Sequence, residues 1–271
     1  MLEIEPYNDL VMCIRTGSGQ SGQVVMWTYS YLIEDTLFDA GCANAREELA
    51  EALRTYQIKR LFISHAHEDH VGACSIFEDE ATIYATSEVA EELRNPIELT
   101  EFFRAVWGQP EPVSKIEPMP AFFEVADLHF EVIPLPGHNA NMVGFHEPNK
   151  KWLFSADAVP VPSRKKMGML DENIPQTLAT LEMIQSLDLE ILFDSHRGPI
   201  EKPAEHIQRR IDYLREFQRE VKQLHERGKS VEEIQEALGL EGPWYLELTA
   251  DRFGISYVIE SVIRDSEFSG T

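Results

Sequence analysis

The segment at residues 60–72 constrains the fold more than any other part of the sequence. Its first five residues are mostly apolar and predict a short strand that leads toward a helix at about 71–77. Between the two lie four potential metal ligands, His65, His67, Asp69 and His70. Neutral imidazoles and a carboxylate suit zinc and other borderline divalent cations. A polar surface loop, or histidines that cap the helix, would explain this density of ligands poorly, so we interpret the segment as part of a metal site.

Three further polar residues follow other predicted strands, and they are His138, Asp157 and His196. Taken singly, each would more often be a turn or capping residue. A metal needs more ligands than one loop can supply, however, and the strand ends of a β-sandwich converge at one rim. We therefore expect these three side chains to meet the first four there.

Two strand-rich halves, each followed by helices, indicate two sheets that pack together and are covered by helices. The predicted strands are residues 10–15, 24–33, 37–38, 60–64 and 82–85 in the first half, and 128–134, 142–146, 152–155 and 190–194 in the second. The C-terminal part is helical, because apolar residues recur every three or four positions from Ile207 to Leu224. Since no flexible linker precedes these helices, we expect residues 201–271 to be a helical extension packed on the domain formed by residues 1–200.

The charge balance is strongly acidic, with 24 basic against 47 acidic residues and a net charge of −23. Such a field repels phosphate backbones, which disfavours a nucleic-acid partner, although a local basic groove is compatible with it. No uncharged apolar run is long enough to span a membrane, and the N-terminus shows no signal peptide. The scattered residues Cys13, Cys42 and Cys74 are typical of reduced, buried thiols. We therefore expect a soluble cytoplasmic protein.

The motif His65-x-His67-x-Asp69-His70, followed in order by His138, Asp157 and His196, resembles the metallo-β-lactamase superfamily. The resemblance covers roughly residues 10–200 and is closest to the glyoxalase II-like and related hydrolase branches. It implies an α+β fold, namely a four-layer αββα sandwich of two mixed β-sheets flanked by helices. Residues 1–200 would be the catalytic domain of this fold.

The resemblance also implies a role for each residue of the motif. His65, His67 and His138 would bind one cation, Asp69, His70 and His196 a second, and Asp157 would bridge both. Asp39 matches a family position that supports the site. Two divalent cations are expected, with zinc as the first choice and iron or manganese as the alternatives.

Two cations so placed lower the pKa of a shared water until hydroxide exists near neutral pH. We expect this metal-bridged hydroxide to attack a small ester, thioester or lactone-type substrate, while one metal polarises the oxygen that gains charge. Asp69 is the candidate catalytic residue, orienting the hydroxide and carrying a proton to the leaving group. The chain is thus predicted to be a binuclear metal-dependent hydrolase.

At three places this sequence differs from other branches of the superfamily, and these differences narrow the predicted activity. Asp157 argues against a dedicated β-lactamase, because those members typically lack the bridging acid. Ala158 and the two residues after it stand where lactonases usually have a tyrosine, and His67 stands where diiron flavoproteins have glutamate. Three alternatives remain: a phosphodiesterase or ribonuclease using the same two metals, a mononuclear iron dioxygenase acting on a persulfide, and a non-catalytic binding module. The complete ligand set disfavours the last of these.

Some features of the sequence stay open. Residues 95–112 carry Phe102, Phe103 and Trp107 at helical spacing, which is more typical of a core than of a lid over the rim. The basic residues 163–166 are more typical of a solvated loop than of a site for an anionic substrate. The sequence allows a homodimer and does not identify the residues that bind the substrate.

Overall fold

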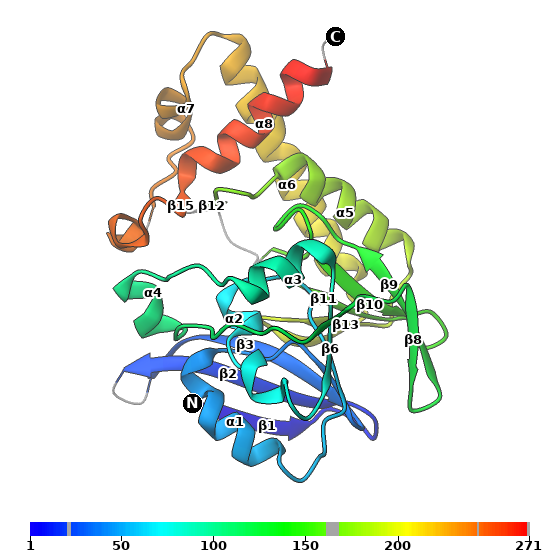
Figure 1. The fold of residues 1–271 in the computed structure, drawn as a ribbon. Helices are drawn as coiled ribbons and strands as arrows, with labels where there is room; N and C mark the ends of the chain where they lie inside the picture. The colour runs from blue at the N-terminus through cyan, green and yellow to red at the C-terminus, as the bar shows by residue number, and fades with distance from the viewer. Residues whose placement is uncertain (21–22, 161–167, 243, 270–271) are drawn as a thin grey trace. The chain divides into compact units, whose positions relative to one another are not determined.

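The chain forms two compact units whose segments alternate along the sequence (Figure 1). The computed structural model describes residues 1–20, 23–160, 168–242 and 244–269. Unit 1 comprises Met1–Pro134, Val143–Ala156 and Glu190–Glu201. Unit 2 comprises Leu135–Met142, Asp157–Leu189 and Lys202–Thr271. The expected division into residues 1–200 and 201–271 stays a prediction, and each unit is described by itself below.

The larger sheet of unit 1 contains its strands in the order of the sequence. They are β1 (Leu2–Pro6), β2 (Met12–Gln20), β3 (Gln23–Ile33), β4 (Thr36–Phe38), β5 (Arg60–Phe62), β6 (Thr82–Ala85) and β7 (Ile116–Pro118). Strands β1 to β4 pair antiparallel, whereas β4 to β7 pair parallel. The sheet is therefore mixed, and the parallel strands end at the same edge.

The second sheet of unit 1 is also mixed. Its strands, in spatial order, are β14 (Gly198–Glu201), β13 (Ile191–Asp194), β11 (Trp152–Ala156), β10 (Val143–Glu147), β9 (Leu128–Pro134) and β8 (Phe122–Val125). Only β11 and β13 pair parallel among these described strands, and Ala156 lies opposite Asp194. The carboxyl ends of β11 and β13 therefore lie side by side.

A core of aromatic side chains joins the two sheets of unit 1. Phe38 from β4 stacks on Phe154 from β11 with ring centroids 4.7 Å apart. Phe62 from β5 likewise stacks on Phe123 from β8, at 3.9 Å. Because each pair joins one sheet to the other, the sheets lie face to face as in a sandwich, and burial of these large rings provides much of the stabilisation.

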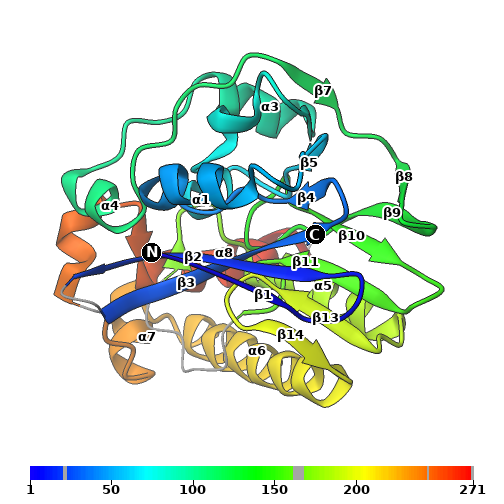
Figure 2. The ribbon, with the colours of Figure 1, turned by 90° about the horizontal axis from the view of Figure 1, so that it is seen from below.

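Helices cover the other face of the larger sheet (Figure 2). The helical segments of unit 1 are η1 (Ala43–Ala45), α1 (Arg46–Leu53), α2 (Glu68–Val71), η2 (Cys74–Phe77), α3 (Ser87–Arg94) and α4 (Glu101–Val106). The helix expected at 71–77 is divided between α2 and η2. Gly72 lies at the division, and a Cβ there would be 2.1 Å from the backbone nitrogen of Ala43, so this close approach of two backbones requires glycine.

Unit 2 is mainly helical. It contains β12 (Gly168–Met169), α5 (Ile174–Ser186), α6 (Ala204–Glu226), α7 (Val231–Ala237), η3 (Trp244–Thr249), β15 (Phe253–Gly254) and α8 (Ile255–Ser269). Ile207, Ile211 and Leu214 on α6 are buried, as the apolar stripe in the sequence predicts. None of the helices within the described ranges is long and apolar enough to cross a membrane.

The expected α+β class with two mixed sheets, flanking helices and a helical C-terminal part is confirmed. Each of the nine strands expected from the sequence has a counterpart in the two sheets of unit 1. Strands β1, β7, β8 and β14 were not expected, because they are short or contain proline and charged residues that weaken a strand pattern.

Candidate metal centre

Two imidazoles of the first motif point toward one another directly after strand β5. His65 is fully buried, and its Nε2 lies 2.9 Å from Nδ1 of His67. The hydroxyl of Ser64 donates its single proton to Asp39 Oδ2 at 2.7 Å, so its oxygen accepts from Nδ1 of His65 at 3.0 Å. In a neutral imidazole this leaves Nε2 of His65 as the nitrogen that carries the lone pair and can bind a cation.

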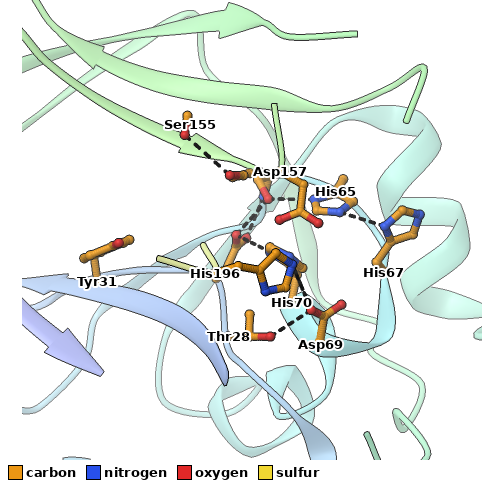
Figure 3. Close-up of polar contacts among 12 residues, drawn as sticks. Thr28, Tyr31, His65, His67, Asp69, His70, Ser155, Asp157 and His196 are labelled. Carbon is orange, nitrogen blue, oxygen red and sulfur yellow. Dashed lines mark hydrogen bonds and ion pairs between the residues drawn. The ribbon is translucent and has the colours of Figure 1, made fainter. Parts of the chain in front are cut away.

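A second group of three side chains gathers in unit 1 from two distant parts of the chain (Figure 3). Asp69 and His70 lie in α2, and His196 follows the end of β13. Oδ2 of Asp69 lies 3.8 Å from Nε2 of His70 and 3.9 Å from Nε2 of His196. All three ligand atoms lie within 4.8 Å of one another.

The outer ring nitrogens of this second group are fixed by acceptors. Nδ1 of His70 donates to Asp39 Oδ2 at 2.8 Å, and Nδ1 of His196 donates to the backbone oxygen of Trp27 at 3.0 Å. A carboxylate or carbonyl can only accept, so both neutral rings carry their proton on Nδ1 and present Nε2 to the centre. Such hydrogen bonds fix the tautomer and the orientation of metal-binding histidines.

Asp39 links the segment that carries His65 to the second ligand group of unit 1. Its Oδ1 accepts from the backbone N–H of Ser64 at 2.8 Å, and its Oδ2 accepts from both Ser64 Oγ and His70. Its backbone has a φ of 58°, a left-handed conformation that aspartate tolerates better than most residues. The residue expected to support the site therefore contacts one predicted ligand directly and a second through Ser64.

The remaining two predicted ligands lie in unit 2. Nε2 of His138 lies 3.1 Å from Oδ2 of Asp157. The loop that carries His138 is tied to α5 at two points, because Asn173 N–H donates to Gly137 O at 2.7 Å and Thr180 Oγ1 donates to Pro136 O at 2.6 Å. The next residue, Asn139, donates from Nδ2 to Asp171 Oδ2 at 2.9 Å.

The electrostatics of unit 1 favour a cation near the second group. Burial, with the negative charge of Asp69 as the next cause, raises the pKa of the Cys42 thiol to about 12. Burial likewise raises the pKa of Cys74, with the charge of Asp39 as the next cause. Both carboxylates therefore produce a negative potential in a buried region, which a divalent cation would neutralise.

The donor atoms of the second group fit a divalent cation. Two ligand atoms that each lie about 2.0–2.2 Å from one ion are at most about 4.0–4.4 Å apart. The two separations from Asp69 Oδ2, at 3.8 and 3.9 Å, satisfy this limit. Two imidazole nitrogens and one carboxylate oxygen are also the donors expected for zinc and its neighbours.

Three other sequence features, namely the aromatic segment, the cysteines and the basic residues, were also interpreted above. Phe103 and Trp107 are buried, which fits a core role for this segment, and the backbone N–H of Asn44 donates to the oxygen of Trp107 at 3.0 Å. All three cysteines are buried free thiols, as expected. The basic residues 163–166 lie outside the described residues.

Ser64, Trp27 and Thr28 were not found from the sequence, although each contacts a predicted ligand. Ser64 directly precedes His65, which is a signal that could have been used. Trp27 acts through its backbone oxygen, which leaves no trace in the sequence. Thr28 Oγ1 donates to Asp69 Oδ2 at 2.8 Å (Figure 3), and its only signal is a polar residue inside an apolar strand.

Comparison with known families matches residues 28–196, more than half of the chain, to the model of the metallo-beta-lactamase superfamily. The chain belongs to this superfamily. The match includes every residue of the predicted metal motif, from His65 to His196. The expected family is therefore confirmed.

Individual relatives are distant. An atrochrysone carboxyl ACP thioesterase of Aspergillus fumigatus is 24% identical over 217 residues, which is 77% of this chain. The match spans only 63% of that thioesterase.

Solved structures support the fold. A metallo-beta-lactamase family protein of Thermus thermophilus has a TM-score of 0.70 at 17% identity and covers 98% of this chain and 95% of its own. A metallo-beta-lactamase of Pontibacter korlensis has a TM-score of 0.61 at 16% identity and covers 79% of this chain and 99% of its own. At these identities the likeness establishes the fold alone.

Proposed function

We propose that this chain is a metal-dependent hydrolase that holds two divalent cations, zinc before iron or manganese. His65, His67 and His138 would hold one cation, Asp69, His70 and His196 would hold the other, and the carboxylate of Asp157 would serve both. The observation that carries the proposal is the second group of unit 1. Its three ligand atoms converge, and the outer nitrogens of both its histidines are already fixed by acceptors.

The course of the chain supports the roles of His138 and Asp157. The loop with His138 begins after Pro134 and ends before Val143, and these two residues pair across β9 and β10. The N–H of Val143 donates to the oxygen of Ser64, the residue before His65, at 3.0 Å. Val143, which follows the loop and pairs with Pro134 before it, thus lies next to the first motif in unit 1.

Asp157 is held in a similar way by its covalent neighbour. It follows Ala156 directly, and Ala156 O accepts from the N–H of Ser195, the residue before His196, at 3.4 Å. Consecutive Cα atoms are about 3.8 Å apart, so Asp157 has little freedom to leave the end of β11. This restriction favours a carboxylate that reaches both ligand groups.

A pair of divalent cations supplies Lewis acidity that makes hydroxide available near neutral pH and stabilises charge on the substrate oxygen. The protein contributes the orientation of the reacting groups. Asp69 directs Oδ2 toward His70 and His196, and we propose that its other oxygen orients the attacking water and takes its proton. The proton then passes from Asp69 to the leaving group, as in general acid–base catalysis.

We propose a small acyl compound as the substrate, with a thioester before an ester or lactone. The thioesterase of Aspergillus fumigatus supports the thioester. The net charge of −23 disfavours a polyanion such as RNA, because repulsion would oppose its approach. Cleavage of a phosphodiester and oxidation of a persulfide are the outcomes against which this proposal is tested.

The direct test replaces Asp157 by alanine. We expect D157A to keep its fold by circular dichroism, to lose metal, and to lose at least a hundredfold in hydrolysis of a thioester. Asp212→Ala, an exposed aspartate on α6 of the same unit, is the matched control and should keep both properties. The purified, metal-analysed protein is assayed on thioester, lactone, phosphodiester and RNA substrates, and on a persulfide with oxygen consumption as the readout. Full activity of D157A on any of them contradicts the bridging role.

A further inference from the structure

Strand β3 presents two consecutive residues to the second ligand group of unit 1. The backbone oxygen of Trp27 accepts from Nδ1 of His196, and the hydroxyl of Thr28 donates to Oδ2 of Asp69 at 2.8 Å. Thr28 is fully buried and Asp69 is nearly so, so water does not replace this bond if it is removed. The strand thus fixes one histidine and the carboxylate beside it.

The oxygen that Thr28 contacts is the one that faces both imidazoles. Oδ2 of Asp69 lies 3.8 Å from Nε2 of His70 and 3.9 Å from Nε2 of His196. The terminal torsion of aspartate is broad and roughly twofold, so either oxygen could take this place unless a partner selects one. A carboxylate oxygen has two lone-pair directions, and donation from Thr28 occupies one while leaving the other for a cation.

We infer that Thr28 is a positioning residue that selects Oδ2 of Asp69 as the metal-binding oxygen and leaves Oδ1 to the reacting water. The inference rests on the proposed function and deepens it, because it assigns the orientation of the Asp69 carboxylate to a residue of β3. The hydroxyl has a single proton, which goes to Asp69. The side chain of Cys42 also lies within hydrogen-bonding reach of Thr28.

The neighbouring strand provides a matched control. Thr16 of β2 lies directly opposite Thr28 in the sheet and is buried to the same extent. Its Oγ1 accepts from the backbone N–H of Cys42 at 2.9 Å. The two threonines therefore share strand pairing, burial and a cysteine neighbour, and differ in that the hydroxyl of Thr28 donates to a predicted ligand.

The experiment titrates metal-free wild type, T28V, T28S and T16V with Zn²⁺ against a chromophoric chelator, and repeats the titration with Co²⁺ to follow its visible spectrum. Removing a group that orients a ligand typically weakens metal binding about 10- to 100-fold. We expect T28V to weaken one of the two binding steps by this factor and to change the Co²⁺ spectrum of that step. T28S, which keeps the hydroxyl, and T16V should stay within about threefold of wild type.

Three results overturn the inference: wild-type affinity for both ions in T28V, an equal loss in T28S, or an equal loss in T16V. The last two would mean that packing of the strand, rather than the hydroxyl, is responsible. Near-UV circular dichroism checks the fold, and T28A replaces T28V if the valine variant does not fold. If wild type itself takes up no zinc, the proposed function fails. If wild type binds two ions and T28V binds them equally well, only the role of Thr28 fails.

Discussion

Asp39→Asn tests how much the hydrogen bonds around the metal motif contribute to the fold. The carboxylate accepts three hydrogen bonds, from Ser64 N–H at 2.8 Å, Ser64 Oγ at 2.7 Å and His70 Nδ1 at 2.8 Å. In asparagine one of the two acceptor atoms becomes an NH₂ group, which cannot accept. The least costly orientation keeps both bonds at the Oδ2 position and directs the NH₂ toward the backbone N–H of Ser64.

That orientation leaves a buried N–H group without an acceptor, because Ser64 is only 1% exposed. Loss of a hydrogen bond to a charged group costs about 1.5–3 kcal/mol. A change of 1 kcal/mol shifts the melting temperature of a domain of this size by about 2–4 °C. We therefore expect metal-free D39N to melt roughly 3–12 °C below wild type. Its zinc affinity should fall about 10- to 100-fold, because His70 loses its charged partner.

Thermal unfolding of the metal-free proteins, followed by circular dichroism, measures the first effect, and zinc titration measures the second. Asp35→Asn is the control, because Asp35 forms ion pairs with Lys59 at 3.0 Å and Arg60 at 3.3 Å but remains partly exposed. Exposed pairs contribute about 0–1 kcal/mol, so D35N should melt within about 4 °C of wild type and bind zinc normally. If D39N behaves like D35N in both assays, the reasoning about the Asp39 hydrogen bonds is refuted.

Further predictions concern the His138 loop, the thiols and the metals. Gly137→Ala would place a Cβ 2.5 Å from the backbone nitrogen of Thr177, at a φ of 136°, so we expect a loss of about 1–3 kcal/mol in denaturant unfolding and weaker zinc binding. An unchanged midpoint would contradict this. Burial raises the pKa of Cys13 and Cys42 to about 12 from 9.0, so both thiols stabilise the fold fully below pH 9 and less as the pH rises toward 12. At pH 8 a disulfide reagent should react slowly with the native protein and quickly in guanidinium, and equal rates would disprove the burial. Removal of bound metal by a chelator should lower the melting temperature, since a ligand at a thousand times its Kd stabilises by about 4 kcal/mol.

The sequence predicted the parts of the fold that depend on local patterns. Histidines and an aspartate placed within six positions after an apolar strand reveal a ligand cluster without any knowledge of pairing. Strands such as β11 and β13 are also evident, because continuous apolar runs are typical of buried strands. The family resemblance added the order of the later ligands and the role of Asp157.

The parts that the sequence did not reveal depend on pairing between distant segments. Thr28 contacts Asp69 across 41 positions of sequence, and His196 finds its acceptor, Trp27, across 169. These contacts arise from strand pairing and from the packing of α2 beside β3, which no local period encodes. The need for glycine at position 72 likewise results from a tertiary contact, the close approach of the Ala43 backbone.

The most direct test of the proposed site is anomalous diffraction from crystals of the zinc-loaded protein, combined with metal analysis of the same sample. We predict two zinc ions per chain about 3.5–4 Å apart. One should be bound by His65, His67 and His138, the other by Asp69, His70 and His196, and Asp157 should contact both. A single ion, or two ions that do not share Asp157, would contradict the proposed site.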